Sequence, residues 1–181
     1  MKNNVEKIVL ISGKARAGKD TTANYMKQYF ESKGKKVIVL AFAYYLKEYV
    51  KNITGWDGKE ETKPRSDLQY IGTDLIRNQI DKDLFVNRII EDIKVYGHFF
   101  DIVILDDTRM LNEIENIKDV FDNVITINVV RPNFVSELNE KQKAHATENE
   151  LNGYNFDFEI INDGSLEDLE TKVLEIGSEI L

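Results

Sequence analysis

Apolar runs and helical patterns alternate along most of the chain. Continuous apolar stretches, typical of strands buried on both faces, occur at residues 5–12, 37–42, 101–106, 123–130 and 156–161. Between them, apolar side chains recur every three or four residues, which is the spacing of one face of an α-helix. Strands that alternate with helices form βαβ units, and these require a parallel sheet covered on both faces. The pattern therefore predicts an α/β fold of three layers around a five-stranded parallel sheet.

Two segments interrupt this alternation. Residues 44–97 are mostly helical, with helices expected at 66–80 and 84–96 and a loop at 55–64 that contains two glycines and a proline. Residues 132–155 are polar and irregular. No linker divides the chain, so we expect a single domain over residues 1–181 that carries these two insertions. Its core is expected to comprise residues 1–43, 98–131 and 156–181.

The composition narrows the classes of function. The chain has 181 residues, a net charge of −8, two histidines and no cysteine. The absence of cysteine excludes disulfides, thiolate zinc sites and a cysteine nucleophile. The acidic charge argues against a nucleic-acid or membrane-surface partner, since both would require a basic field. No apolar stretch is long enough for a secretory signal or a membrane span, so we expect a cytoplasmic protein.

The clearest chemical motif follows the first predicted strand. Residues 13–19 have the spacing Gly-x-x-x-x-Gly-Lys of a phosphate-binding loop, or P-loop. Gly13 and Gly18 permit backbone angles that point several amide N–H groups into one anion-sized hollow. The helix that begins near Lys19 adds the positive end of its dipole, and the lysine reaches the β- and γ-phosphates of a nucleotide. The residues expected to bind ATP here are Gly13, Lys14, Ala15, Arg16, Ala17, Gly18, Lys19, Asp20 and Thr21.

Asp20 stands where a Ser or Thr hydroxyl ordinarily helps to hold Mg²⁺. Its carboxylate is a hard oxygen ligand that could bind the ion directly or through water. Alternatively, its negative charge only stabilises the N-terminus of the helix, where the helix dipole is positive. The residues alone leave both interpretations open.

A second acidic site is expected at the end of the third predicted strand. The apolar run at residues 103–105 ends in Asp106, an arrangement that orients Mg²⁺ beside a phosphate loop. Asp107 is the competing candidate. Arg109 follows within three residues, at the strand edge where ligands bind in open parallel sheets. We expect its guanidinium to bind phosphate, or alternatively to pair with Glu113.

Further basic residues are candidates for binding a second phosphate. Lys47, Arg65 and Arg77 lie in the helical segment 44–97, although Arg77 could instead form a surface ion pair with Asp74. Arg131 follows the fourth predicted strand, and the polar segment 132–155 adds further cations that could close over the donor. These are Lys141, Lys143 and His145.

Together these residues resemble the nucleoside-monophosphate-kinase branch of P-loop kinases, and most closely the deoxynucleoside monophosphate kinases of the bacteriophage type. Phosphomevalonate kinase is a near relative of this group. The motifs that carry the resemblance extend along most of the chain, and Asp20 belongs to the first of them. They are Gly-x-x-x-x-Gly-Lys-Asp-Thr at 13–21, Phe42-Ala43 with Lys47, Leu68-Gln69-x-x-Gly72-Thr73-Asp74-x-x-Arg77, Asp106-Asp107-x-Arg109 with Asn112-Glu113, Arg131, His145-x-x-Glu148 and Ile161-Asn162-Asp163-Gly164.

The resemblance implies transfer of the γ-phosphoryl group of ATP, with Mg²⁺, to a (deoxy)nucleoside monophosphate. It implies Lys19, Arg77 and Arg109 as catalytic residues, Asp20 and Asp106 as metal ligands, and Arg131 as a donor contact. Residues 44–97 would form the acceptor-binding insert and 132–155 a short lid. The implied acceptor-binding residues are Lys47, Arg65, Gly72, Thr73, Arg77, Asp106 and Arg109.

Two alternatives remain at this point. The chain could phosphorylate another small phosphorylated acceptor, of the phosphomevalonate or dephospho-coenzyme A type. It could also be a nucleotide-binding regulatory module without phosphoryl transfer. A homodimer is left open.

Overall fold

The computed structural model describes residues 5–132 and 149–181. Lys141, Lys143 and His145 therefore lie outside the described residues, together with most of the expected lid. The described elements alternate between strands and helices along the chain, as the sequence predicts. They are β1 (Lys7–Ser12), α1 (Lys19–Ser32), β2 (Val37–Leu40), α2 (Ala43–Thr54), α3 (Arg65–Gln69), η1 (Tyr70–Ile80), α4 (Leu84–Tyr96), β3 (Ile102–Thr108), α5 (Leu111–Val120), β4 (Val124–Val130), β5 (Phe158–Ile161) and α8 (Leu166–Ile180).

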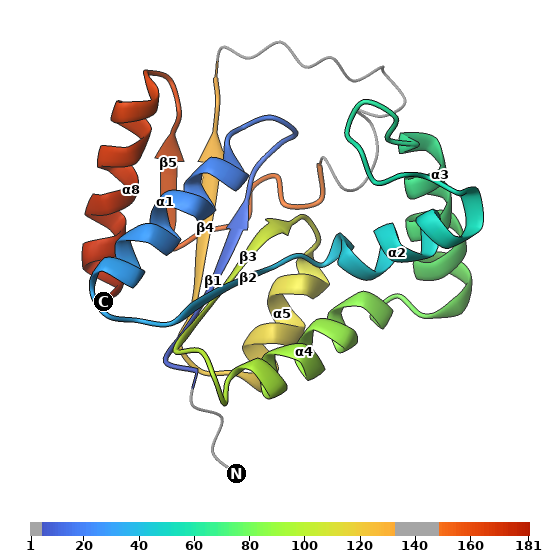
Figure 1. The fold of residues 1–181 in the computed structure, drawn as a ribbon, viewed down its shortest axis with the longest axis horizontal. Coiled ribbons are helices and arrows are strands. Elements are labelled where there is room, and N and C mark those ends of the chain that lie inside the picture. The colour runs from blue at the N-terminus through green and yellow to red at the C-terminus, as the bar shows by residue number, and fades with distance from the viewer. Residues whose placement is uncertain (1–4, 133–148) are drawn as a thin grey trace.

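The strands form one sheet in the order β2-β3-β1-β4-β5, and every neighbouring pair is parallel. This confirms the predicted five-stranded parallel sheet. Strand β1 lies at its centre, so the loop that follows β1 emerges between the ends of β3 and β4 (Figure 1). The carboxyl ends of all the strands meet at this edge, which is where ligands bind in open α/β sheets.

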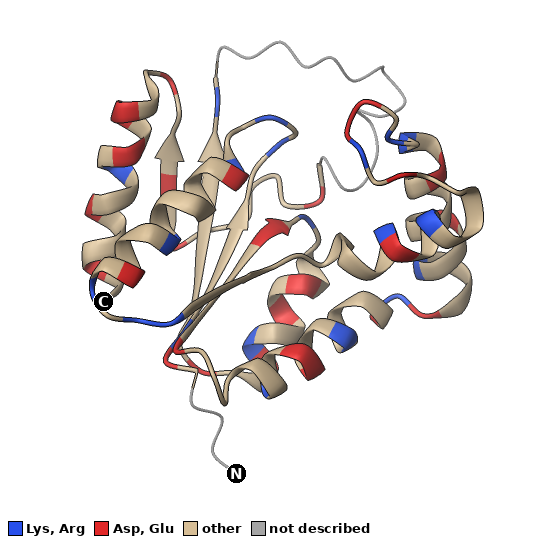
Figure 2. Cartoon of the chain, in the orientation of Figure 1, with Lys and Arg blue, Asp and Glu red and all other residues tan. Residues whose placement is uncertain are grey.

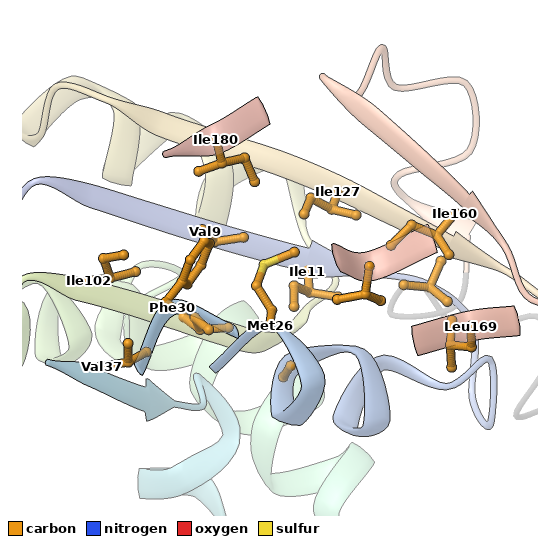
Figure 3. Close-up of a cluster of buried hydrophobic side chains, with 14 of the residues drawn as sticks. Val9, Ile11, Met26, Phe30, Val37, Ile102, Ile127, Ile160, Leu169 and Ile180 are labelled. Carbon is orange, nitrogen blue, oxygen red and sulfur yellow. The ribbon is translucent and has the colours of Figure 1, made fainter. Parts of the chain in front are cut away.

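Helices cover both faces of the sheet because consecutive β1 side chains point to opposite sides. On one face, Met26 and Phe30 of α1 pack with Val9 and Ile11 of β1 in a core completed by residues of α8 (Figure 3). On the other face, α4 and α5 contribute the apolar side chains that bury Ile8 and Leu10. Helices on both faces of the sheet confirm the predicted three-layer architecture.

Helices α2, α3 and η1 form a helical arm (residues 43–80) beyond the edge of the sheet (Figure 1). The arm has its own small core around Val50, Ile71, Ile76 and Phe85. Phe85 belongs to α4, whose next turns pack on the sheet, so α4 joins the arm to the main core. None of the helices in the described part of the chain combines the length and the apolar character needed to cross a membrane.

Two predictions of local structure were wrong in detail. The expected helix at 66–80 is divided, with residues 70–80 in a π-helix whose turns are wider than those of an α-helix. The third strand does not end at Asp106 but continues to Thr108, because its pairing with β1 shifts register and then resumes at Ser12 and Thr108. Asp106 and Asp107 therefore lie inside β3, at the point where its register against β1 shifts.

Candidate active site

The loop between β1 and α1 adopts the backbone geometry expected of a phosphate-binding loop. Gly13, Arg16 and Gly18 have positive φ angles of 147°, 61° and 108°. A Cβ atom at Gly13 would lie 2.4 Å from the Val129 carbonyl oxygen, and one at Gly18 would lie 2.6 Å from Asn162 Nδ2. Both glycines are therefore required by their backbone angle and by the closeness of their neighbours.

Lys19 is held at the mouth of this loop. Its side chain is largely buried, and its Nζ donates hydrogen bonds to the carbonyl oxygens of Gly13 at 2.7 Å and Lys14 at 3.0 Å. From the far side, Asn162 Nδ2 donates to the Ala17 carbonyl oxygen at 2.8 Å and so ties the loop after β5 to the phosphate loop. These contacts fix the Lys19 ammonium group and the backbone of the phosphate loop beside an open space.

That space is a cleft of about 1090 Å³ between the phosphate loop, the end of β3 and the helical arm. The chain carries basic residues in the phosphate loop and after β3, next to the acidic tip of β3, as the colouring by charge shows (Figure 2). Most of the residues predicted for the site line this cleft. They are Ala15, Arg16, Gly18, Lys19, Asp20, Thr21, Lys47, Arg65, Gly72, Thr73, Arg77, Asp106, Arg109 and Arg131.

The remaining loop residues face a neighbouring cavity. Gly13, Lys14 and Ala17 line a space of about 680 Å³ on the other side of the loop, which Arg109 and Arg131 also border. Among the residues that the structure describes, the predicted binding and catalytic residues thus all lie in the phosphate loop or line the cleft beside it.

The structure separates the roles of the two aspartates in β3. Both Asp107 carboxylate oxygens accept backbone N–H groups at the start of α2, from Phe42 at 2.8 Å and from Ala43 at 3.0 Å. Asp107 therefore stabilises the beginning of the helical arm. Both aspartates line the cleft, and at Asp106 burial and the charges of Asp107 and Asp20 raise the pKa to about 7, while Lys47 opposes this shift.

Asp20 and Asp106 together form a donor set that suits Mg²⁺. Among the described residues there is no group of three or more acidic or histidine side chains that could enclose a metal. Mg²⁺ requires no such group, because it is commonly held by one or two carboxylates, water and the phosphates of the substrate. A dication would also relieve the repulsion that raises the pKa of Asp106.

Arg77 has a different partner from the one considered from the sequence. Its Nη2 donates to Glu113 Oε1 at 2.6 Å, so the pairing with Asp74 is not the one found. The Glu113 side chain is 2% exposed and that of Arg77 is 13% exposed. The sequence also allowed an ion pair between the Arg109 guanidinium and Glu113. In the structure Glu113 is buried, and it accepts a hydrogen bond from the Arg109 backbone N–H at 2.7 Å.

Several cleft residues were not predicted as site residues. Glu60 lies between Lys63, at 2.9 Å, and Arg65, at 2.7 Å, on the arm side of the cleft. Phe85 and Glu113 also line it. Glu113 and Asn162 belong to motifs of the family resemblance and could have been found there, whereas Glu60 and Lys63 have no sequence signal beyond alternating charge in a loop.

Gly13→Ala is expected to lower the free energy of unfolding by about 2 to 4 kcal/mol, because the new methyl group meets a backbone oxygen and the φ angle strains an L-residue. Gly34 is a matched control, since its φ is 82° and no described atom lies within 4 Å of the point that an alanine methyl group would occupy. Gly34→Ala should cost only about 1 kcal/mol. Urea unfolding of both variants tests this, and equal losses would contradict the close-packed account of Gly13.

A family model described as deoxynucleotide monophosphate kinase matches residues 29–173, a range that begins after the phosphate loop. The chain is 29% identical over 145 residues to the deoxynucleotide monophosphate kinase of Enterobacteria phage T4, and 32% identical over 110 residues to that of Escherichia phage RB69. These alignments cover 80% and 60% of this chain, and 55% and 42% of the relatives. The chain thus spans about half the length of the curated relatives it matches.

Among solved structures, the chain is similar to the APS kinase of Mycobacterium tuberculosis, determined in complex with AMPPNP and APS. The TM-score is 0.57 at 14% identity, and the match covers 95% of this chain and 97% of the other. At this identity the likeness concerns the fold alone, and it confirms the three-layer P-loop kinase fold.

Proposed function

Because the chain belongs to the deoxynucleotide monophosphate kinase family, we propose that it transfers the γ-phosphoryl group of ATP to the phosphate of a (deoxy)nucleoside monophosphate. The products would be the nucleoside diphosphate and ADP. The observation that carries the proposal is one cleft that joins a phosphate loop, two carboxylates and basic residues from the helical arm. A single Mg-ATP would need only the first two of these groups, whereas a donor together with a phosphorylated acceptor would use all three.

On the donor side, the proposed contacts come from the phosphate loop. Its amide N–H groups and the start of α1 bind phosphate oxygens, and Lys19 places its ammonium group at the β- and γ-phosphates. To do so, Nζ exchanges the Gly13 and Lys14 carbonyl oxygens for phosphate oxygens. Arg131, after β4, is proposed to contact the donor as well.

Asp20 and Asp106 are the residues that would hold Mg²⁺, directly or through water. When bound, the ion supplies positive charge to the phosphate oxygens of ATP. Lys47 supports this arrangement from α2, since its charge lowers the pKa of Asp106. Bound Mg²⁺ would favour the ionised form of Asp106, whose pKa is otherwise raised to about 7, and so would make its carboxylate available as a ligand.

On the acceptor side, the helical arm and the end of β3 supply the proposed contacts. Arg77 and Arg109 line the cleft and offer guanidinium forks that fit phosphate oxygens. Gly72 permits close packing of η1 against α2, because a Cβ there would lie 2.7 Å from Leu46 Cδ2. The other proposed acceptor residues are Lys47, Arg65, Thr73 and Asp106.

The proposed mechanism depends on position and charge. In phosphoryl transfer, charge spreads over the oxygens of the transferred group, so catalysis consists chiefly of alignment and electrostatic stabilisation. Lys19, Arg77 and Arg109 would supply that stabilisation from three sides. The acceptor phosphate is already ionised at neutral pH, so no side chain is needed to remove a proton from it.

We further propose that residues 44–97 bind the acceptor and that 132–155 act as the lid, closing over the donor to exclude water. Within the insert, α4 also packs on the sheet, and this anchors the arm at one end. We expect the enzyme to act in the cytoplasm, without nucleic acid or membrane as a partner. Whether the enzyme forms a homodimer stays open.

An acceptor panel tests the proposed function. Purified protein with Mg-ATP is expected to form ADP only when a nucleoside or deoxynucleoside monophosphate is added. Phosphomevalonate and dephospho-coenzyme A serve as the other phosphorylated acceptors. ADP formation with one of these alone would replace the proposed acceptor. ATP-dependent thermal stabilisation without turnover on any acceptor would instead indicate a binding module.

A further inference from the structure

Glu113 is a buried carboxylate that touches both sides of the cleft. It lies in the first turn of α5 and is only 2% exposed. One oxygen, Oε1, accepts Arg77 Nη2 from the helical arm at 2.6 Å. The other, Oε2, accepts the backbone N–H groups of Arg109 at 2.7 Å and Met110 at 3.0 Å. A single side chain thus joins the arm to the loop after β3.

A carboxylate in this position requires these partners. A buried charge is costly unless it is paired and hydrogen-bonded. Burial raises the pKa of Glu113, and the Arg77 guanidinium and the Arg109 N–H oppose that shift. Its three hydrogen bonds, from Arg77, Arg109 and Met110, are all of the kind that favours the ionised carboxylate. The carboxylate therefore has the contacts it needs only when Arg77 and the Arg109 backbone are both in place.

Arg77 is held on its other sides as well. Its Nη1 lies 3.5 Å from Asn112 Oδ1, and its Cζ lies 5.9 Å from the ring centre of Phe85. Asn112 Nδ2 in turn donates to Asp83 Oδ1 at 2.8 Å, just beyond the end of η1. The start of α5 thus fastens the end of the arm and fixes the orientation of the Arg77 guanidinium at the cleft wall.

We propose that Glu113 is a positioning residue that sets Arg77 and the Arg109 loop in the geometry needed to receive the acceptor phosphate. It acts through Arg77 and Arg109 and does not itself contact the substrate. The inference rests on the proposed function, because it assigns these two arginines to a phosphorylated acceptor. It predicts that a change at Glu113 impairs the acceptor side of the reaction and leaves the donor side intact.

Glu113→Gln is the most direct variant. A glutamine amide has nearly the same size but turns one acceptor oxygen into an NH₂ donor, which opposes either Arg77 or the backbone N–H groups. A displacement of about 1 Å in a positioned group can cost about a hundredfold in rate. The KM for the monophosphate is expected to rise about tenfold or more and kcat to fall about a hundredfold. The KM for ATP should stay within about twofold of the wild-type value.

The matched control is Glu115→Gln. Glu115 lies two residues further along α5 and is exposed. It should leave the kinetic parameters of both substrates unchanged. Calorimetric titration with the monophosphate, without ATP, provides a second readout that does not depend on catalysis. Acceptor affinity should fall in Glu113→Gln and not in Glu115→Gln.

A double-mutant cycle tests whether Glu113 acts through Arg77. In an Arg77→Met background, Glu113→Gln should raise the acceptor KM by clearly less than the increase of about tenfold expected in the wild type, because only its hydrogen bonds to the Arg109 loop remain to be lost. The double variant replaces a buried ion pair by neutral groups of similar size, which proteins tolerate better than the loss of one partner. The acceptor KM of the double variant can therefore still be measured if Glu113→Gln alone is too unstable. Asn112→Ala, which loosens Arg77 from its other side, should raise the acceptor KM by a few fold at unchanged ATP KM.

Two results would overturn the proposal. One is wild-type acceptor KM and affinity in folded Glu113→Gln, and the other is an undiminished effect of Glu113→Gln in the Arg77→Met background. A failure of the proposed function looks different, because the wild-type protein itself would then form no acceptor-dependent ADP with any monophosphate.

Discussion

Replacing Lys19 by methionine is expected to lower kcat for phosphoryl transfer by about a thousandfold. Methionine keeps much of the apolar stem of lysine but removes the charge that follows the transferred phosphoryl group. The side chain is almost fully buried beside the loop, so neither solvent nor another residue of α1 can place a charge at the same position. The loss of two hydrogen bonds to loop carbonyl oxygens should cost only about 1 to 2 kcal/mol of stability.

Lys27→Met is the matched control for this prediction. Lys27 lies on the same helix, two turns further on, and its ion pair with Glu31 is exposed and 3.8 Å long. Its loss should leave the rate unchanged within about twofold and stability unchanged within about 0.5 kcal/mol. Steady-state rates with Mg-ATP and a monophosphate measure both variants. A Lys19→Met protein that is folded and retains even a tenth of the wild-type rate would rule out the proposed donor site.

Asp106→Asn is expected to lower the rate and not the stability, whereas Asp107→Asn is expected to lower the stability. Asp106→Asn removes a proposed Mg²⁺ ligand and should lower kcat by about a hundredfold or more. Its stability should stay equal to the wild type or rise, since the mutation relieves repulsion among buried and neighbouring carboxylates. Asp107→Asn weakens two charge-assisted hydrogen bonds to the start of α2 and should lower stability by about 1 to 3 kcal/mol.

Thermal unfolding without metal and a Mg²⁺ titration of the rate separate the two aspartates. Asp106→Asn should require more Mg²⁺ for half-maximal rate, whereas Asp107→Asn should show a Mg²⁺ dependence close to that of the wild type. Exchanged behaviour, with the metal dependence altered in Asp107→Asn alone, would show that the assignment within β3 is wrong.

The layers of the fold could be predicted from the sequence because burial on both faces produces continuous apolar runs. The runs around Ile8–Ile11 and Ile102–Leu105 have this form, and helices of regular period separate them. The parallel sheet follows, since each crossover helix must lie on one of its faces. The phosphate loop was also predictable, because its motif lies within seven consecutive residues, 13–19.

The strand ends and the helix type were harder to predict. They depend on pairing with distant segments, as when β3 continues to Thr108 only because Ser12 pairs with it. The π-helix at 70–80 likewise has no distinct periodic signature in a stretch of this length. Local hydrophobic pattern does not carry either kind of information.

The division of roles within the site also required the structure. Asp106 and Asp107 are adjacent and chemically identical, and only the N–H groups of Phe42 and Ala43, about 65 residues away, distinguish them. The same holds for Arg77, whose partner Glu113 is 36 residues distant while Asp74 is three residues away. Helical spacing favours the near partner, but the packing of the arm on α5 brings the distant one into contact.

The most direct test of the central claim is to follow the γ-phosphate of ATP itself. The protein is incubated with Mg²⁺, ATP radiolabelled in the γ-phosphate, and each common nucleoside and deoxynucleoside monophosphate in turn. The proposed function predicts that the label moves to the β-position of a nucleoside or deoxynucleoside diphosphate, with one ADP formed for each labelled product, and that Lys19→Met abolishes the transfer. Label released only as inorganic phosphate, or retained in ATP with every monophosphate, would contradict it.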